Sequence, residues 1–220
     1  MKKIVLAGFL LLFSSTVWSQ TATTARLSTG FAANEFTASL DGGRMHQLGK
    51  KQRLLLGYGL RYTHFRGSNV NYITAPAALT TKDKLDTLVL GSSSVNSFNA
   101  YVQLGYQFLP KWAVTFDIDV LGASFGAERS GVFTSTEDAS FNGVQKGSPT
   151  ALNVLLVGDN DRGSLNSNFS LRYQVNENWQ IQTGMTYLFT EFTTTQNLSD
   201  ANDRFRRKST FFMLGLQYRF

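Results

Sequence analysis

The chain has 220 residues, a formal net charge of +6, three Pro, 19 Gly and no Cys. The lack of Cys excludes disulfide scaffolds, cysteine-based zinc sites, thiol enzymes and a bacterial lipoprotein anchor. Charged residues make up 16% of the chain, which is low against the roughly 25% of typical soluble domains. The 42% of apolar residues excludes a disordered chain. A soluble β-sandwich and a membrane β-barrel both remain.

The N-terminus has the three parts of a secretory signal. Lys2 and Lys3 precede an apolar run of ten residues from Ile4 to Phe13, and the segment ends on the small residue Ser19. Such a run rises only about 15 Å as a helix, half of what a bilayer requires. We predict that residues 1–19 are a cleaved signal peptide and that residues 20–220 form a single domain. Losing Lys2 and Lys3 leaves a net charge of +4, and the scattered basic residues argue against nucleic-acid binding.

The remaining chain consists of segments in which apolar and polar residues alternate. In the last segment Phe212, Leu214, Leu216, Tyr218 and Phe220 share one face, and the other face is mostly polar or small. The same period of two recurs at 54–62, 98–108, 112–120, 165–175 and 179–189. Each segment suits a tilted strand that crosses a membrane, with one side in lipid and one in a lumen. The polar faces carry Gln, Asn, Thr, Ser and Gly rather than Lys and Glu, which favours a narrow lumen over bulk solvent.

Together these features resemble the small outer-membrane β-barrel proteins of diderm bacteria. The resemblance rests on the signal segment, the alternating strands, Trp112 and Trp179 directly behind tight turns, and the ending Leu-Gly-Leu-Gln-Tyr-Arg-Phe. The long loops suggest the Bacteroidetes-type members of this group. The resemblance implies that the barrel lies in outer-membrane lipid and that the barrel-assembly machinery reads the C-terminal segment.

Turn lengths predict the orientation of the strands. The tight turns at 109–111 and 176–178 are expected on the periplasmic side, where Trp112, Trp179 and Phe220 would form an aromatic girdle. The long connections at about 67–95, 126–162 and 193–205 are then extracellular.

A first hairpin completes the strand count. We expect its strands at about 24–32 and 35–45, with a turn at Ala33-Asn34 and a periplasmic link from Asp41 to Lys51. The result is an all-β, antiparallel, up-and-down transmembrane barrel of eight strands. Ten strands are the alternative, with Thr87–Leu90 and Ala151–Val157 as the additional ones.

Charged residues fall on the inward phase of several strands. An eight-stranded interior is just wide enough to be filled by side chains, and an unpaired charge there is costly. We therefore predict a filled lumen with a rigidifying network of paired charges rather than a gated ion path. Its members are Arg53, Arg61, Asp117, Asp119 and Arg172, joined in this register by Arg26, Glu35, Asp41, Arg207 and Arg219.

The sequence contains no convincing catalytic or metal site. His46 and His64 fall near opposite ends of the barrel, and the run Asp159 to Gly163 lacks the distal Glu of a calcium loop. We expect neither a cofactor nor a metal.

One apolar stretch stands out within the second long loop, and it carries Leu152, Val154, Leu155, Leu156 and Val157. It would pack over the barrel mouth or extend a strand, or else bind an apolar ligand, lipid or protein partner. The favoured function is a non-enzymatic barrel with a structural or partner-contacting role. A small transport or ligand-binding barrel is the alternative, and a lipid-modifying enzyme a distant third.

Overall fold

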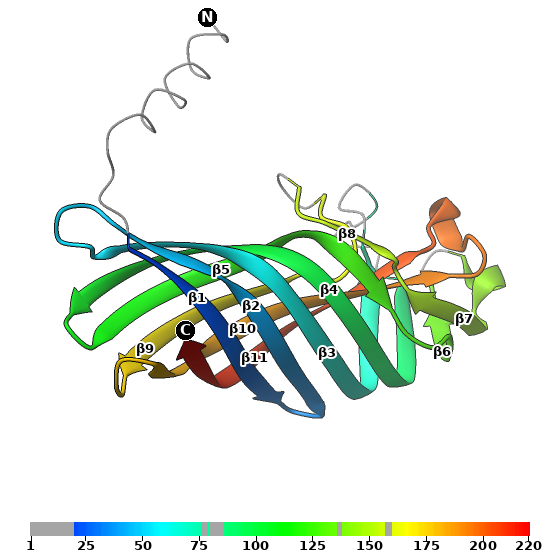
Figure 1. Cartoon of the computed structure of the whole chain (residues 1–220). Coiled ribbons are helices and arrows are strands. Elements are labelled where there is room, and N and C mark those ends of the chain that lie inside the picture. The colour runs from blue at the N-terminus through cyan, green and yellow to red at the C-terminus, as the bar shows by residue number, and fades with distance from the viewer. Residues whose placement is uncertain (1–19, 76–78, 80–85, 136–137, 157–159) are drawn as a thin grey trace, which may run out of the picture.

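The computed structural model describes residues 20–75, 79, 86–135, 138–156 and 160–220, so the predicted signal segment 1–19 lies outside the described residues. The described chain forms one antiparallel sheet of eleven strands (Figure 1). No helix in the described part is both long and apolar enough to cross a membrane. The strands are β1 (Gln20–Ala32), β2 (Glu35–Leu48), β3 (Leu54–Thr74), β4 (Thr87–Leu109), β5 (Trp112–Phe125), β6 (Arg129–Thr134), β7 (Gly143–Pro149), β8 (Leu152–Val154), β9 (Asn166–Gln174), β10 (Trp179–Thr194) and β11 (Arg204–Arg219).

Eight of these strands close into a ring. Each strand pairs with the next in the order β1, β2, β3, β4, β5, β9, β10, β11, and β11 pairs back onto β1. The last contact is continued past the strand by the N–H of Phe220, which donates to the carbonyl of Thr23 at 3.0 Å. This confirms the predicted antiparallel barrel of eight strands, including the first hairpin, where Asn34 turns with φ 59°.

The outer and inner faces of this ring have the reverse polarity of a soluble protein. Outward residues such as Leu27, Leu40, Leu60, Phe169 and Leu214 are exposed, whereas the buried inward residues are largely polar, with charged, amide and hydroxyl side chains. This pattern is what a membrane barrel requires, because its outer face meets hydrocarbon and its inner face meets other polar groups.

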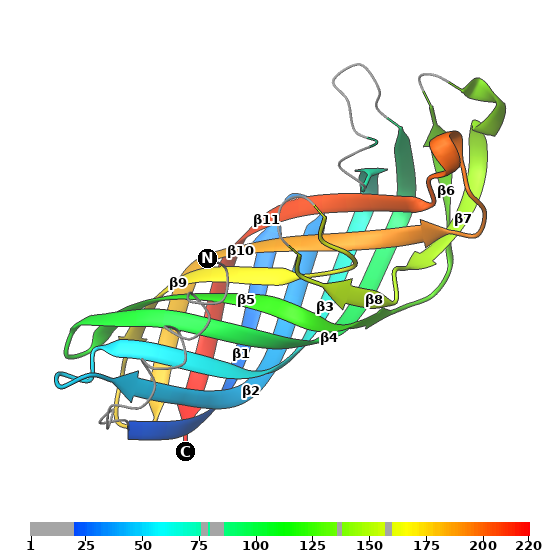
Figure 2. The ribbon, with the colours of Figure 1, turned by 90° about the horizontal axis from the view of Figure 1, so that it is seen from above.

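A second, narrower ring extends the barrel at one end. Beyond the tip of the β1–β2 hairpin, Phe205 and Arg206 of β11 pair with Thr74 and Ile73 of β3. On the other side β6 joins β4, β7 joins β6, and the end of β7 joins the end of β10. The upper parts of β3, β4, β10 and β11 thus form a six-stranded ring with β6 and β7, here called the extension. Figure 2 shows it projecting past the ends of β1, β2, β5 and β9.

The extension corrects the predicted loop lengths. The connection expected at 67–95 is shortened to 75–86, because β3 continues to Thr74 and β4 begins at Thr87. The alternation breaks at Asn69, whose φ is 53°, so that inward residues change from odd numbers (Phe65) to even numbers (Val70, Tyr72). A bulge of this kind shifts the phase without ending the strand.

The two strands added in the alternative ten-strand count do not enlarge the ring. Thr87–Leu90 is the part of β4 that lies in the extension, and Leu152–Val154 is a separate short strand outside the ring.

The opposite end carries the tight turns and is here called the short-turn end. The β4–β5 and β9–β10 turns lie there, at the left of Figure 1. β1 also begins and β11 also ends at this end of the barrel. The predicted link from Asp41 to Lys51 is wrong in its start, since β2 continues to Leu48 and only residues 49–53 make the turn. Gly49 and Gln52 provide the positive φ values of 84° and 51° that this turn needs.

An apolar cluster lies inside the extension and the adjoining part of the barrel. All its members are at most 2% exposed, and aromatic rings meet edge to face at 5.2 Å for Tyr72–Phe192 and 5.6 Å for Phe133–Phe205. Such contacts add to the stabilisation from burial. The cluster comprises Phe65, Val70, Tyr72, Leu88, Leu90, Val95, Phe133, Leu188, Phe192, Leu198, Phe205 and Phe211.

Candidate functional site: a charged network inside the barrel

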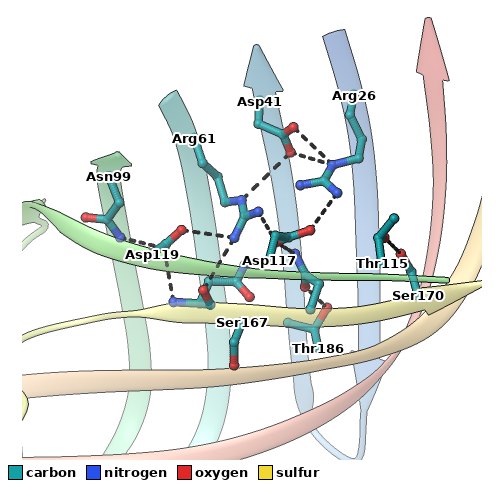
Figure 3. A network of polar contacts seen from close by, with 12 residues as sticks. Arg26, Asp41, Arg61, Asn99, Thr115, Asp117, Asp119, Ser167, Ser170 and Thr186 are labelled. Carbon is teal, nitrogen blue, oxygen red and sulfur yellow. Dashed lines mark hydrogen bonds and ion pairs between the residues drawn. The ribbon is translucent and has the colours of Figure 1, made fainter. Parts of the chain in front are cut away.

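Asp117 of β5 is the centre of the polar interior. It accepts hydrogen bonds from Arg26 Nη1 at 2.8 Å, from Arg61 Nη2, and from the amide of Asn168 at 2.8 Å. Arg26 and Arg61 come from β1 and β3, so their contacts reach across the lumen, whereas Asn168 lies beside Asp117 on the neighbouring strand β9 (Figure 3). Asp117 is fully buried, and its three donors compensate for the loss of water around the carboxylate.

Two further aspartates extend the network on either side. Asp41 of β2 accepts from Arg26 Nε at 2.8 and 3.0 Å through its two carboxylate oxygens. Asp119 of β5 accepts from Arg61 Nη1 at 2.9 Å and from the Asn99 amide at 2.7 Å. Both Arg26 and Arg61 therefore bridge two or more carboxylates, and every group is at most 4% exposed.

Tyr101 of β4 covers the two bridging arginines. Its ring centroid lies 4.7 Å from the guanidinium carbon of Arg61 and 5.7 Å from that of Arg26. The ring can lie there because Gly43 and Gly59 have no side chains. A Cβ on Gly43 would come within 2.8 Å of the Tyr101 hydroxyl, and one on Gly59 within 2.9 Å of its ring. These cation–π contacts are desolvated and so contribute more than exposed ones.

Arg172 of β9 lies in the same interior, yet it is held differently. Its Nε donates to Gln182 at 3.1 Å, and the amide oxygen of Gln103, in the orientation its neighbours favour, accepts from the guanidinium group. Arg172 is 3% exposed. Within the described chain no carboxylate forms an ion pair with it.

The remaining predicted lumen charges lie away from this network. Arg53 is exposed and lines a cavity at the short-turn end, and Arg219 lines the same cavity. Arg207 is paired with Glu35 at 2.9 Å, nearer the extension. The inward position of each follows from the alternation, but the depth of each along the barrel decides what it can contact.

Sequence reasoning did not single out the neutral members of the network. Asn99, Asn166 and Asn168 share the inward phase of the aspartates, which is the signal that could have indicated them. The N–H of Asn166 donates to Asp119 at 3.0 Å. The Thr186 hydroxyl donates a hydrogen bond to the Asn168 amide oxygen at 2.6 Å, which connects the network to β10.

The predicted aromatic girdle gathers at the short-turn end. Trp112 contacts Tyr173 with centroids 4.8 Å apart, and Trp179 contacts Tyr218 at the same distance. Tyr218 in turn contacts Phe220 at 4.8 Å, and Phe220 is 72% exposed. Amphipathic rings of this kind suit the boundary between lipid and water.

The apolar loop segment is placed beside the end of β5, where it adds a short strand at the edge of the sheet. Leu152 to Val154 form β8, which pairs with Leu121 to Ala123. Leu152 and Leu156 are 47% and 49% exposed, while Leu155 donates its N–H to the Val120 carbonyl at 2.9 Å. Val157 lies outside the described residues. Asn153, in the middle of this segment, is fully buried and donates to Asn99 at 2.7 Å.

A second charged cluster lies on the outer side of β10 and β11. Glu191 is fully buried and accepts from Arg204 Nε at 2.8 Å and Arg206 Nη2 at 2.7 Å. Both arginines also donate to the carbonyl of Asp161, which brings the segment before β9 over the pair. The period-two pattern assigns Glu191 to the outer face, so only tertiary contact with this segment explains its burial.

The histidines lie apart on the outer face. His46 lies 2.9 Å from the Thr21 hydroxyl and is stacked on Tyr58, while His64 lies 2.9 Å from the Asn96 amide oxygen. Within the described residues no group of three or more His, Asp or Glu is placed to hold a metal. Asp159 of the calcium-like run lies outside the described residues, and Asp161 accepts from the N–H of Leu156 at 2.7 Å.

The fold defines the class: an eight-stranded, antiparallel transmembrane β-barrel with an inverted polarity and a six-stranded extension. No family model and no curated protein matches the chain.

Solved structures similar to the chain include Neisserial surface protein A, with 10% identity over 92% of this chain and 99% of that one and a TM-score of 0.42. Another is Ail of Yersinia pestis in complex with a heparin analogue, with 12% identity, coverage of 92% and 97% and a TM-score of 0.37. A major outer membrane protein of Thermus thermophilus has 11% identity, coverage of 91% and 100% and a TM-score of 0.36. The expected Bacteroidetes-type lineage finds no support in these matches.

Proposed function

We propose that this chain is an integral outer-membrane protein that is closed to solutes and non-enzymatic, and that its extension presents a contact surface outside the cell. The observation that carries the proposal is the reversed polarity of the barrel, with exposed apolar side chains outside and fully buried ion pairs inside. Exposing the apolar outer face to water would be unfavourable, which supports its location in lipid. An open pore would hydrate the ion pairs of the inner face, so their burial supports a closed interior.

Closure is supported at two levels of the interior. The network around Asp117 crosses the lumen between β1 and β5, and the apolar cluster follows within the extension. The buried acids of the network are engaged with arginines and amides. They are thus held in an ionic structure rather than presented to a substrate, which supports a non-enzymatic role.

The contact role is supported by an apolar row on the outer face of the extension. Val132 pairs with both Val89 and Val144, and the three are 53%, 38% and 72% exposed. The polar residues Arg66 and Ser94 lie between this row and the apolar belt below on β3 and β4. An apolar row outside the membrane belt suits contact with a macromolecule.

The location and direction of the barrel can be tested with single cysteines, because the chain contains none. Val144→Cys lies on the extension and Lys51→Cys at the short-turn end, and both positions are exposed. We expect a membrane-impermeant maleimide to label Val144→Cys in intact cells, and Lys51→Cys only after the outer membrane is disrupted. The reverse pattern would refute the orientation, and equal labelling would refute the membrane location.

Closure is tested separately in planar bilayers. We expect the purified protein to give no discrete conductance steps, because side chains occupy the lumen at two levels. A large porin inserted in the same lipid controls for insertion. Reproducible steps from this protein alone would refute closure and favour the transport alternative.

A further inference from the structure

Two adjoining cavities open at the short-turn end of the barrel, on the side of the network opposite the extension. They share Gln47, Gln107, Gln174 and Arg219 in their linings. The deeper one has a volume of about 40 Å³ for the centres of water-sized spheres, and it reaches Arg172. Together they are here called the short-turn cavity.

The charges that line the short-turn cavity all have one sign. Its described lining contains neither Asp nor Glu, and its charged members are Lys51, Arg53, Lys111, Arg172 and Arg219. A concave site with walls of low dielectric constant concentrates the field of such charges, so the cavity attracts anions.

Arg172 provides a second, independent indication. It is buried, and among the described residues it is held only by the neutral amides of Gln182 and Gln103. Arg26 and Arg61, in contrast, each contact two or more aspartates. Asp117 and Asp41 attract Arg172 only from beyond ion-pair distance, and a buried cation with no carboxylate in direct contact is costly. The cavity below Arg172 is the space from which an anion could supply that direct contact.

The neutral lining suits the same kind of ligand. Five glutamines line the deeper cavity around Arg172, and a glutamine amide can donate two hydrogen bonds to oxygen atoms. A guanidinium group adds planar, paired donors that match carboxylate and phosphate. The five are Gln47, Gln107, Gln174, Gln180 and Gln217.

We infer that the short-turn cavity binds an oxyanion group, a carboxylate or a phosphate, that enters from the short-turn end. Arg172 supplies the buried charge at the bottom of the cavity, and Lys111 and Arg219 supply charge nearer the opening. This site goes beyond the proposed contact role, because it lies at the end of the barrel opposite the extension and requires no external partner.

Trp112 lines the cavity and can report its occupation. Of the other two tryptophans, Trp18 lies in the predicted signal peptide, so Trp179→Phe alone leaves Trp112 as the single tryptophan of the mature protein. We expect sodium phosphate or sodium succinate to change its fluorescence saturably at constant ionic strength set with sodium chloride. A parallel titration with short-chain phosphatidylglycerol in neutral micelles distinguishes a lipid headgroup from a free anion as the source. Absence of saturation with all three probes would overturn the proposal.

The variants Arg172→Gln and Arg219→Gln identify the site. We expect Arg172→Gln to weaken binding of the effective probe about tenfold, the loss of one charge-assisted contact, and Arg219→Gln to weaken it about threefold. Arg219→Gln is at the partly exposed rim, so it keeps the test available if Arg172→Gln does not fold. Arg66→Gln, exposed on the outer face of β3, is the matched control and should bind as the parent does. Equal affinity in the folded cavity variants would refute the site.

Discussion

Replacing Asp117 by asparagine is expected to destabilise the barrel by about 3–5 kcal/mol, the usual effect of breaking a buried ion pair. The substitution keeps the size of the side chain and removes the charge that Arg26 and Arg61 share. Arg26 then retains only Asp41, and the lumen holds one uncompensated positive charge more. The midpoint of urea unfolding in detergent micelles, followed by tryptophan fluorescence, measures the loss.

An exposed ion pair provides the control for this substitution. Glu128 contacts Lys146 at 3.4 Å, and the two side chains are 45% and 63% exposed. Glu128→Gln should therefore change stability by less than about 1 kcal/mol. The double variant Arg26→Met/Asp117→Asn should recover part of the loss, because it removes the extra positive charge. If Asp117→Asn is no more harmful than Glu128→Gln, the network does not stabilise the barrel.

Replacing Phe205 by alanine is expected to cost the extension about 3–5 kcal/mol, as for other large-to-small substitutions at buried aromatic positions. Phe205 is fully buried, packs edge to face on Phe133, and lies where β11 pairs with β3. The resulting cavity would loosen the seam that closes the six-stranded ring. Limited proteolysis should then cut within 126–149, while the eight-stranded barrel keeps its heat-modifiable migration on detergent gels.

Val144→Ala is the matched control for the extension. Val144 is 72% exposed, so its truncation should change stability by less than about 0.5 kcal/mol and leave the protease pattern unchanged. Cleavage of the Phe205→Ala variant throughout the barrel would show that the two rings unfold as one unit. An unchanged digestion pattern in that variant would show that the apolar cluster does not hold the extension together.

The eight-stranded ring and the six-stranded extension share β3, β4, β10 and β11. The barrel therefore narrows by exchanging strands and needs no separate cap domain. β1 and β2 end near Ala32 and Glu35, which lets β3 and β11 meet above them. β5 and β9 leave the ring on the other side and are replaced by β6 and β7. Pairing the ends of β3 and β11 satisfies N–H and C=O groups that a single short hairpin would leave as open edges.

Much of the barrel could be predicted from the sequence because alternation with a period of two directly reports which face a residue occupies. Phe212, Leu214 and Leu216 lie outside and Asp117 and Asp119 inside, as that pattern requires. The tight turn at Leu109-Pro110-Lys111 and the turn at Asn34 were likewise readable, because turns depend on local residue chemistry.

The tertiary structure alone decided the features that depend on neighbours distant in the chain. The bulge at Asn69 reverses the phase of β3, so alternation does not reveal the last residues of this strand, which lie in the extension. β6 and β7 are too short to be identified without β4 and β10 beside them. Arg53, Arg61 and Arg172 share the inward phase but differ in their surroundings. Arg53 lies at the opening of the short-turn cavity, Arg61 contacts three aspartates, and Arg172 contacts glutamines at the bottom of that cavity. Alternation determines the side of the wall on which a charge lies. The stagger of the strands determines its depth, and depth determines whether it meets a counter-charge, an amide or open space.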